Sequence, residues 1–201
     1  MANFTRVGYG QVEPNQLSAQ KTGQIYASLP LDSAVDVLQN GEFMYYDYKT
    51  GTVTADATVG EPMLVFNEIK LYEPYWQTSY KDFAMIRVGD NYVTSRLATE
   101  TYGDGATNVG APDANHTEYG YRMDGIAPRL FKTNIGDIYT TNMVKTGVEY
   151  EVGDLLAPVK DVTSNTLVLE EAAGTTGMLW QVAKVYTMPD GQPGLKLQRV
   201  Q

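Results

Sequence analysis

The chain has 201 residues and a formal net charge of −9 at pH 7, and it contains no cysteine. The length allows one large domain or two small ones. The acidic balance argues against a protein that coats or reads nucleic acid or binds anionic membranes, because those partners require a basic surface. Without cysteine there are no disulfides, thiolate nucleophiles or cysteine-based metal sites. We therefore expect the partner to be another protein or a neutral glycan.

Residues 1–34 are polar and are interrupted repeatedly by Gly and Pro. They lack the apolar core of a secretory signal, and no run in the chain approaches the roughly 20 apolar residues of a membrane helix. We therefore expect a soluble protein without an ordinary export signal. The segment has more apolar residues than a disordered tail, among them the candidate interface residues Tyr9 and Tyr26. We predict an extended N-terminal arm, with one short strand at 24–29, that becomes ordered against a partner; a frayed terminus is the alternative.

Residues 35–98 are predicted to form a β-rich region. At its start, Asp32 to Leu38 could form one helical turn, with Asp32 or Ser33 as the cap. Strand patterns follow, and turn signals that contain Gly separate them. The expected strands lie at 42–48, at 52–54, at 63–73, where a short helix is the alternative, and as a pair at 83–97.

An aromatic cluster lies within this region and consists of Tyr72, Tyr75, Trp76 and Tyr80. Aromatic rings beside amide and hydroxyl groups occur in sugar sites, in protein interfaces and in ordinary cores, and all three interpretations remain open. The chain contains 15 Tyr, a residue that offers a large contact area at low entropic cost, although β-propensity alone also favours it. We take the four residues as candidate interface residues.

Residues 99–128 form a long loop rich in Gly, Asp and Asn, which is typical of a functional or mobile segment. It contains the only histidine, His116, but no G-x-S-x-G nucleophile pattern accompanies it. The glycines at 103–110 are not followed by the Lys-Ser/Thr of a phosphate-binding loop. Several acids and amides could gather a calcium ion, but their spacing matches no EF-hand. We therefore predict no catalytic residue, metal or cofactor, and no enzyme activity; a glycan hydrolase that uses paired carboxylates of this loop is the third hypothesis.

Residues 129–201 alternate short apolar runs with frequent turns, which favours a small β-barrel or sandwich. The alternation at 148–152 predicts a strand, and further strands are expected at 155–159, 167–169, 178–188 and 195–200. Pro189-Asp190-Gly191 is a strong turn signal between the last two. The predicted fold class is therefore mainly β, with small barrel or sandwich modules, the N-terminal arm and the long loop.

A short pattern of an apolar residue, Gly and an acid recurs four times, at 59–61, 88–90, 135–137 and 152–154. Gly permits a left-handed or bulged backbone, and the acid can accept hydrogen bonds from nearby turn amides. We predict that these acids form turns. Because the spacings are irregular, the pattern does not indicate a solenoid or propeller.

The C-terminal region resembles auxiliary capsid proteins of tailed bacteriophages, a group that includes decoration, cement and head-fibre proteins. The likeness covers about residues 128–200 and rests on turn motifs: Val152-Gly153-Asp154, then Leu156 with Pro158, and the closing turn Pro189-Asp190-Gly191-Gln192-Pro193-Gly194. The resemblance implies a protein that binds the major capsid protein on the outside of the shell and stabilises it, with no catalytic residues.

From this resemblance we expect a virion protein that is made in the bacterial cytoplasm, self-associates as a homo-oligomer, and binds neither nucleic acid nor membrane. A head-fibre or tail-associated module that binds glycans is the alternative. Both interpretations assign the aromatic residues to the interface.

Overall fold

The structure is a computed structural model that describes residues 4–6, 10–32, 34–35, 37–67, 85–87, 128–174, 176–189 and 191–201. Within these residues the protein is mainly β, as the sequence predicted. The helical elements are a short α-helix, α1 (Ser18–Thr22), and a single 3-10 turn, η1 (Ala57–Val59). The strands are β1 (Val12–Gln16), β2 (Ile25–Tyr26), β3 (Val37–Gln39), β4 (Phe43–Asp47), β5 (Thr52–Thr54), β6 (Met63–Val65), β7 (Met85–Arg87), β8 (Leu130–Phe131), β9 (Ile138–Thr141), β10 (Leu155–Asp161), β11 (Thr166–Glu171), β12 (Trp180–Thr187) and β13 (Pro193–Arg199).

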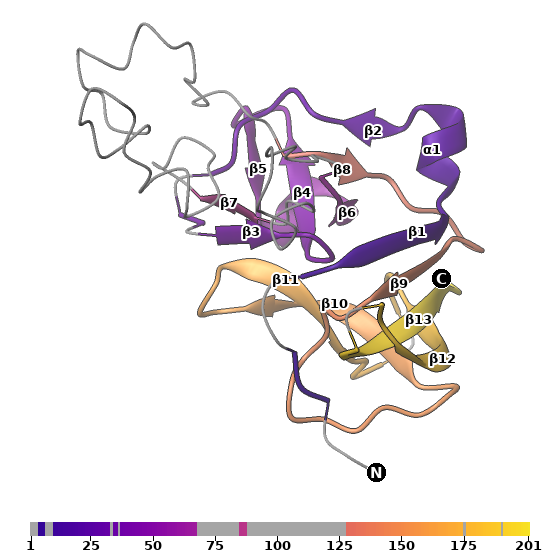
Figure 1. The fold of residues 1–201 in the computed structure, drawn as a ribbon. Coiled ribbons are helices and arrows are strands. Elements are labelled where there is room, and N and C mark those ends of the chain that lie inside the picture. Colours follow the sequence, from indigo (N-terminus) through magenta and orange to yellow (C-terminus); the bar gives the residue numbers. More distant parts are fainter. Residues whose placement is uncertain are drawn as a thin grey trace, which may run out of the picture.

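Eleven of these strands form one antiparallel sheet that curls into a half-barrel (Figure 1). The order along the sheet is β1-β9-β13-β12-β10-β11-β4-β6-β8-β2, with β5 attached to β4, and β3 and β7 form a separate pair. Strands from before and after the long loop are neighbours, because β4 pairs with β11 and β6 pairs with β8. The sheet therefore joins sequence regions that lie far apart in the chain.

The segment predicted as an N-terminal arm contributes three elements to this structure. β1 pairs with β9, β2 pairs with β8, and α1 connects them. The helix ends at Gly23, whose left-handed backbone (φ 70°) is typical of a helix C-terminus. The hydroxyl and N–H of Ser18 both donate to the carboxylate of Asp137, each at 2.9 Å. These bonds fix the start of α1 against the loop before β9.

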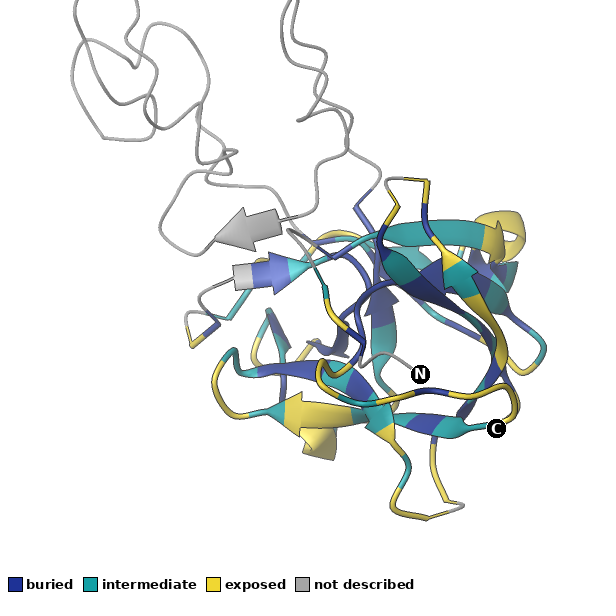
Figure 2. Ribbon diagram, turned by 60° about the horizontal axis from the view of Figure 1, so that its bottom comes forward, coloured by how far each residue is buried: buried dark blue, intermediate teal, exposed yellow. Residues whose placement is uncertain are grey.

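Large aromatic side chains fill the inside of the curled sheet. Trp180 from β12 meets Tyr139 from β9 edge to face, with ring centroids 4.9 Å apart, and Phe43 from β4 lies 6.0 Å from Trp180. All three side chains are fully buried. Figure 2 shows that buried residues lie mostly on the strands, whereas many exposed residues lie on loops and hairpin ends. Burial of this apolar surface is the main stabilising contribution to the fold.

Two copies of the apolar–Gly–acid pattern form turns with the same hydrogen bonds. In the turns 134–137 and 151–154 the glycine at the third position has φ of 94° and 103°, which favours glycine. The N–H of the acid donates to the carbonyl of the first turn residue, at 3.0 and 3.3 Å. In return, the carboxylate accepts from the N–H of that first residue, at 2.9 and 2.7 Å. The prediction that these acids form turns is confirmed at both sites.

Each turn is also fastened to one residue of a neighbouring strand. In the turn 134–137 the glycine N–H donates to the carbonyl of Arg199, and the N–H of Arg199 donates to the carbonyl of the acid, at 2.8 and 2.9 Å. The turn 151–154 makes the same pair of bonds with Val182, both at 2.8 Å. The turns therefore set where β9 and β10 begin relative to β13 and β12.

The helical turn predicted at 32–38 is present only at its start. The N–H of Val35 donates to the carbonyl of Asp32 at 3.0 Å, and the carboxylate of Asp32 accepts from the N–H of Ala34 at 2.9 Å, so Asp32 closes a single turn. From Val37 onward the segment is strand β3, which pairs with β7. One local prediction was wrong. The strand expected at 148–152 is a loop, in which the alternation reflects packing of Tyr150 against Phe4, with ring centroids 5.7 Å apart.

Candidate interaction site

Tyr26 is the one predicted interface residue that lies within the described part of the chain, where it is half-buried on β2. The other predicted interface residues lie outside the described residues; these are Tyr9, Tyr72, Tyr75, Trp76 and Tyr80. His116 and most of the long loop also lie outside them. The site is therefore built from Tyr26 and what surrounds it.

Tyr26 belongs to a row of three aromatic rings. Its ring lies 5.3 Å from that of Tyr46 on β4, and Tyr46 lies 5.0 Å from Tyr48, just after β4. Tyr46 is buried, whereas Tyr48 is 72% exposed. Residues two apart along an extended chain point to the same side, which explains why Tyr46 and Tyr48 meet. We call Tyr26, Tyr46 and Tyr48 the tyrosine row.

Polar groups hold the tyrosine row in place. The N–H of Ser28 donates to the hydroxyl of Tyr46 at 3.1 Å, and the two hydroxyls are also hydrogen-bonded. The carboxylate of Asp47 accepts from the N–H of Lys49 and the hydroxyl of Thr50, at 2.8 and 2.7 Å. These bonds fix the turn that presents Tyr48. The result is an exposed ring on a rigid base beside hydroxyl groups, an arrangement that suits protein and sugar contacts.

The sequence indicated part of the tyrosine row, but neither the exposure of Tyr48 nor the proximity of Tyr26 was predicted. Tyr46 and Tyr48 were assigned to a strand at 42–48, but their exposure was not predicted. Their two-residue spacing indicated that they share a face. The proximity of Tyr26 depends on the pairing of β2 with β8, which lies across the long loop in sequence and leaves no local signal.

A second polar centre is the carboxylate of Glu42, which lies just before β4 and is 2% exposed. It accepts hydrogen bonds from the N–H of Gln39 at 2.7 Å and the hydroxyl of Thr166 at 3.0 Å. Burial raises the pKa of Glu42 to about 7, although these bonds and the positive charge of Arg6 act to lower it. A carboxyl group with this pKa could exchange protons at neutral pH, but its burial leaves no access for a substrate. Its role is to join β4 to β11.

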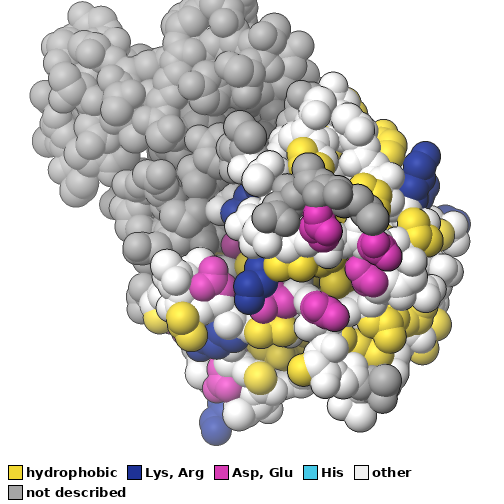
Figure 3. Space-filling view, turned by 90° about the horizontal axis from the view of Figure 1, so that it is seen from below, with side chains coloured by type: hydrophobic (Ala, Val, Ile, Leu, Met, Phe, Trp, Pro, Cys, Tyr) yellow, Lys and Arg dark blue, Asp and Glu magenta, His cyan; other side chains and the backbone are white. Residues whose placement is uncertain are grey.

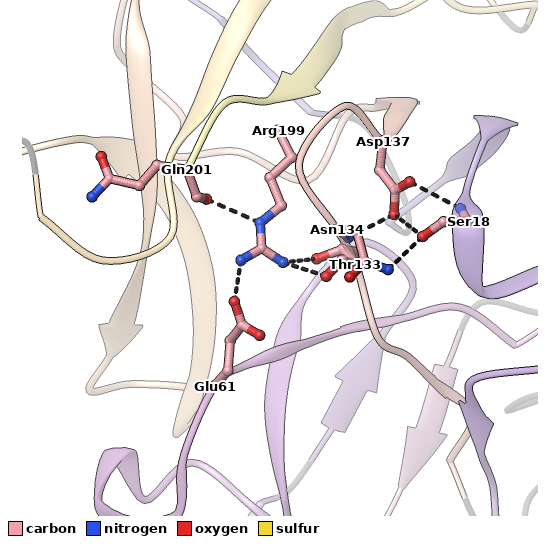
Figure 4. A network of polar contacts seen from close by, with 7 residues as sticks. All are labelled: Ser18, Glu61, Thr133, Asn134, Asp137, Arg199 and Gln201. Atoms are coloured by element: carbon pink, nitrogen blue, oxygen red, sulfur yellow. Dashed lines mark hydrogen bonds and ion pairs between the residues drawn. The ribbon is translucent and has the colours of Figure 1, made fainter. Parts of the chain in front are cut away.

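A third polar centre surrounds the buried guanidinium of Arg199 (Figure 4). It donates to the backbone carbonyl and the hydroxyl of Thr133, forms an ion pair with Glu61, and donates through Nε to the carbonyl of Gln201 at 2.9 Å. Beside it, the carboxylate of Asp137 accepts from Ser18. This network joins β13, α1 and the loop before β6, so we assign it to stability.

Acidic side chains gather on one face of the molecule (Figure 3). Burial raises the pKa of the Tyr150 hydroxyl, and the nearby charges of Glu170, Glu171 and Asp154 raise it further. The ammonium of Lys145 lies 2.6 Å from the carboxylate of Glu170. Acidic side chains therefore lie near the Tyr150 hydroxyl, and Lys145 offsets the charge of one of them.

Comparisons with known proteins gave no match: no protein-family model, no curated protein and no solved structure matches the chain. Among the described residues, no group of three or more His, Cys, Asp or Glu side chains is arranged to hold a metal ion. None of the helices in the described part of the chain is long and apolar enough to cross a membrane. The class that the fold defines is a curled antiparallel β half-barrel, and the tyrosine row is its candidate interaction site.

Proposed function

We propose that the protein is a non-enzymatic structural protein of a tailed-bacteriophage virion that binds the outside of the capsid shell and stabilises it. The observation that carries the proposal is the resemblance of residues 128–200 to auxiliary capsid proteins. The Gly-Asp turn at 151–154, one of the motifs behind that resemblance, is fastened to β12 through Val182. The resembling motif is therefore part of the folded framework.

The tyrosine row is the surface that we assign to the major capsid protein. Tyr48 offers an exposed ring whose position is fixed, so little side-chain entropy is lost on contact. Many copies on a repeating shell would add modest single-site affinities through avidity. The net charge of −9 suits a position outside the shell, away from packaged DNA.

The copy number in purified virions tests the location. Quantitative mass spectrometry would compare this protein with the major capsid protein. A ratio near one, or a simple fraction of it, is expected for a shell component. Complete absence from particles would rule out the proposal.

The stabilising role has a separate test in particles that lack the protein. Such particles are expected to lose DNA at a lower temperature, and purified wild-type protein should restore their resistance. Tyr48→Ala should restore less, whereas Val162→Ala, a change at a side chain that is 89% exposed, should restore as well as wild type. Equal heat resistance with and without the protein would contradict the role.

A glycan-binding head-fibre or tail module is the second candidate function, and the exposed ring of Tyr48 beside the hydroxyls of Tyr46 and Ser28 favours it. A handful of copies per virion, with hits on a glycan array that Tyr48→Ala removes, would support this function over the first. An array without hits would remove it.

A further inference from the structure

We propose that the outer half of β12, residues 183–187, is a docking edge to which a partner polypeptide adds an extended, acidic strand. This inference concerns an edge of the sheet and not the tyrosine row, and it holds whether or not the partner belongs to a virion.

The edge is unpaired because β10 pairs with only the first two residues of β12. β12 pairs with β13 along its length, but with β10 only at Gln181 and Trp180. The turn at 151–154 makes the last bonds on this side, to the N–H and carbonyl of Val182. Beyond this point no strand of the described residues pairs with β12 on that side, and Val185 is 48% exposed.

The backbone groups of this edge point outward at alternate residues. The N–H of Met188 donates to the carbonyl of Gln192, so Met188 faces β13. In an antiparallel ladder the bonding direction alternates, which turns Tyr186 toward β13 and Val185 and Thr187 away from it. Val185 and Thr187 therefore offer two N–H donors and two carbonyl acceptors to an incoming strand.

Four other strand edges in the described part of the chain, those of β1, β10, β2 and β5, are poor templates for strand addition. β1 contains Pro14, and the outer part of β10 contains Pro158, each of which removes a donor. β2 has two residues, and the segment around Pro30 covers β5. The outer half of β12 contains no proline and is rich in β-formers, so it is the best template for strand addition among them.

Two lysine side chains at this edge indicate that the partner strand is acidic. Lys184 lies directly opposite Lys196 on β13, and like charges in this position repel each other. Among the described residues, neither lysine has a carboxylate within ion-pair distance. An incoming strand would place a side chain beside Lys184 on the same face, where Glu or Asp would relieve the repulsion. A second copy of β12 would instead bring another lysine to this face, so we infer an acidic partner.

The test uses the full chain and two short capped peptides, Thr-Glu-Val-Glu-Val-Glu-Thr and Thr-Lys-Val-Lys-Val-Lys-Thr. In titrations followed by NMR, the acidic peptide should shift the amide signals of residues 183–187 and slow hydrogen exchange at Val185 and Thr187. The basic peptide should do neither. Unchanged amide signals with millimolar acidic peptide would overturn the proposal.

Two kinds of variant separate strand pairing from simple charge attraction. Val185→Pro removes an N–H that the isolated sheet does not use, and should weaken binding by at least about tenfold, whereas Val185→Thr keeps the N–H and should bind like wild type. The double change Lys184→Glu and Lys196→Glu should reverse the preference toward the basic peptide, and it tests the proposal even if Val185→Pro does not fold. Equal binding by Val185→Pro, or sedimentation showing that wild type pairs with itself through this edge, would contradict an acidic partner strand.

Discussion

The carboxylate of Glu42 accepts a hydrogen bond from the hydroxyl of Thr166 at 3.0 Å, inside the junction between β4 and β11. Burial raises the pKa of this carboxyl from 4.5 to about 7. Between these two pH values the folded protein binds more protons at Glu42 than the unfolded chain does, so the free energy of unfolding falls as pH rises. The stability contributed by this group is fully present below pH 4.5 and is lost as pH rises through about 7.

Glu42→Gln is therefore expected to flatten the pH dependence of stability. Each pKa unit corresponds to about 1.4 kcal/mol, so ionised Glu42 costs about 3 kcal/mol above neutral pH. The variant should unfold at higher urea concentration than wild type near pH 8, and the advantage should shrink toward pH 5. Urea titrations across this range measure it. Glu171→Gln, at an exposed acid, is the control that should keep the wild-type slope.

Gly41 and Gly51 form a matched pair for testing the close packing of the turn before β4 against Met143, which follows β9. Both have positive φ, 92° and 74°, so alanine is strained at each by about 1 kcal/mol. A Cβ at Gly41 would lie 2.6 Å from Cβ of Met143, whereas a Cβ at Gly51 would meet nothing within 4 Å. We expect Gly41→Ala to cost about 3 kcal/mol and Gly51→Ala about 1 kcal/mol. If both variants lose the same free energy of unfolding in urea titrations, the close contact with Met143 does not add to the cost at Gly41.

The two Gly-Asp turns are expected to differ in their contribution to stability. The carboxylate of Asp137 is buried and accepts three hydrogen bonds, two from Ser18 and one from Asn134. The carboxylate of Asp154 accepts one, from Glu151, in a more exposed place. Asp137→Ala should lower the free energy of unfolding by about 3 kcal/mol and Asp154→Ala by about 1 kcal/mol. A larger loss at Asp154 would contradict the assignment of Asp137 to the network around Arg199.

Tyr139 and Tyr150 should respond in opposite directions to loss of their hydroxyls. The hydroxyl of Tyr139 is buried without a hydrogen-bond partner, whereas that of Tyr150 donates to the carbonyl of Lys145 at 2.8 Å. Tyr139→Phe removes a hydroxyl that has no hydrogen-bond partner, so it should increase the free energy of unfolding by about 1 kcal/mol and raise the melting temperature. Tyr150→Phe removes a hydroxyl that is hydrogen-bonded, so it should decrease the free energy of unfolding by a similar amount and lower the melting temperature. A fall for both variants would indicate that Tyr139 has a partner in solution.

The sequence predicted the strands better than their arrangement. The strands around 52–54 and 167–169 were found because apolar alternation and turn residues are local signals. The turn predicted from Asp32 forms only over 32–35, because pairing with β7, a tertiary contact, makes residues 37–39 a strand. The pairing of β4 with β11 spans more than half the chain and has no local signature.

The candidate site was predicted only in part. Tyr26 was selected for its residue type, but the tyrosine row arises from strand pairing that brings β2 and β4 together through β8 and β6. Glu42 gave no signal, because a glutamate before an apolar strand resembles any surface acid until the fold buries it. Turn chemistry was predictable because one glycine and one acid determine it within four residues.

The position of β13 determines when this protein can fold during synthesis. β13 lies between β9 and β12 in the middle of the sheet, yet it is translated after every other strand described here. While it is still inside the ribosome, the facing edges of β9 and β12 are unpaired, and the apolar side chains that it covers remain exposed. The half-barrel therefore closes only after β13 has emerged from the ribosome.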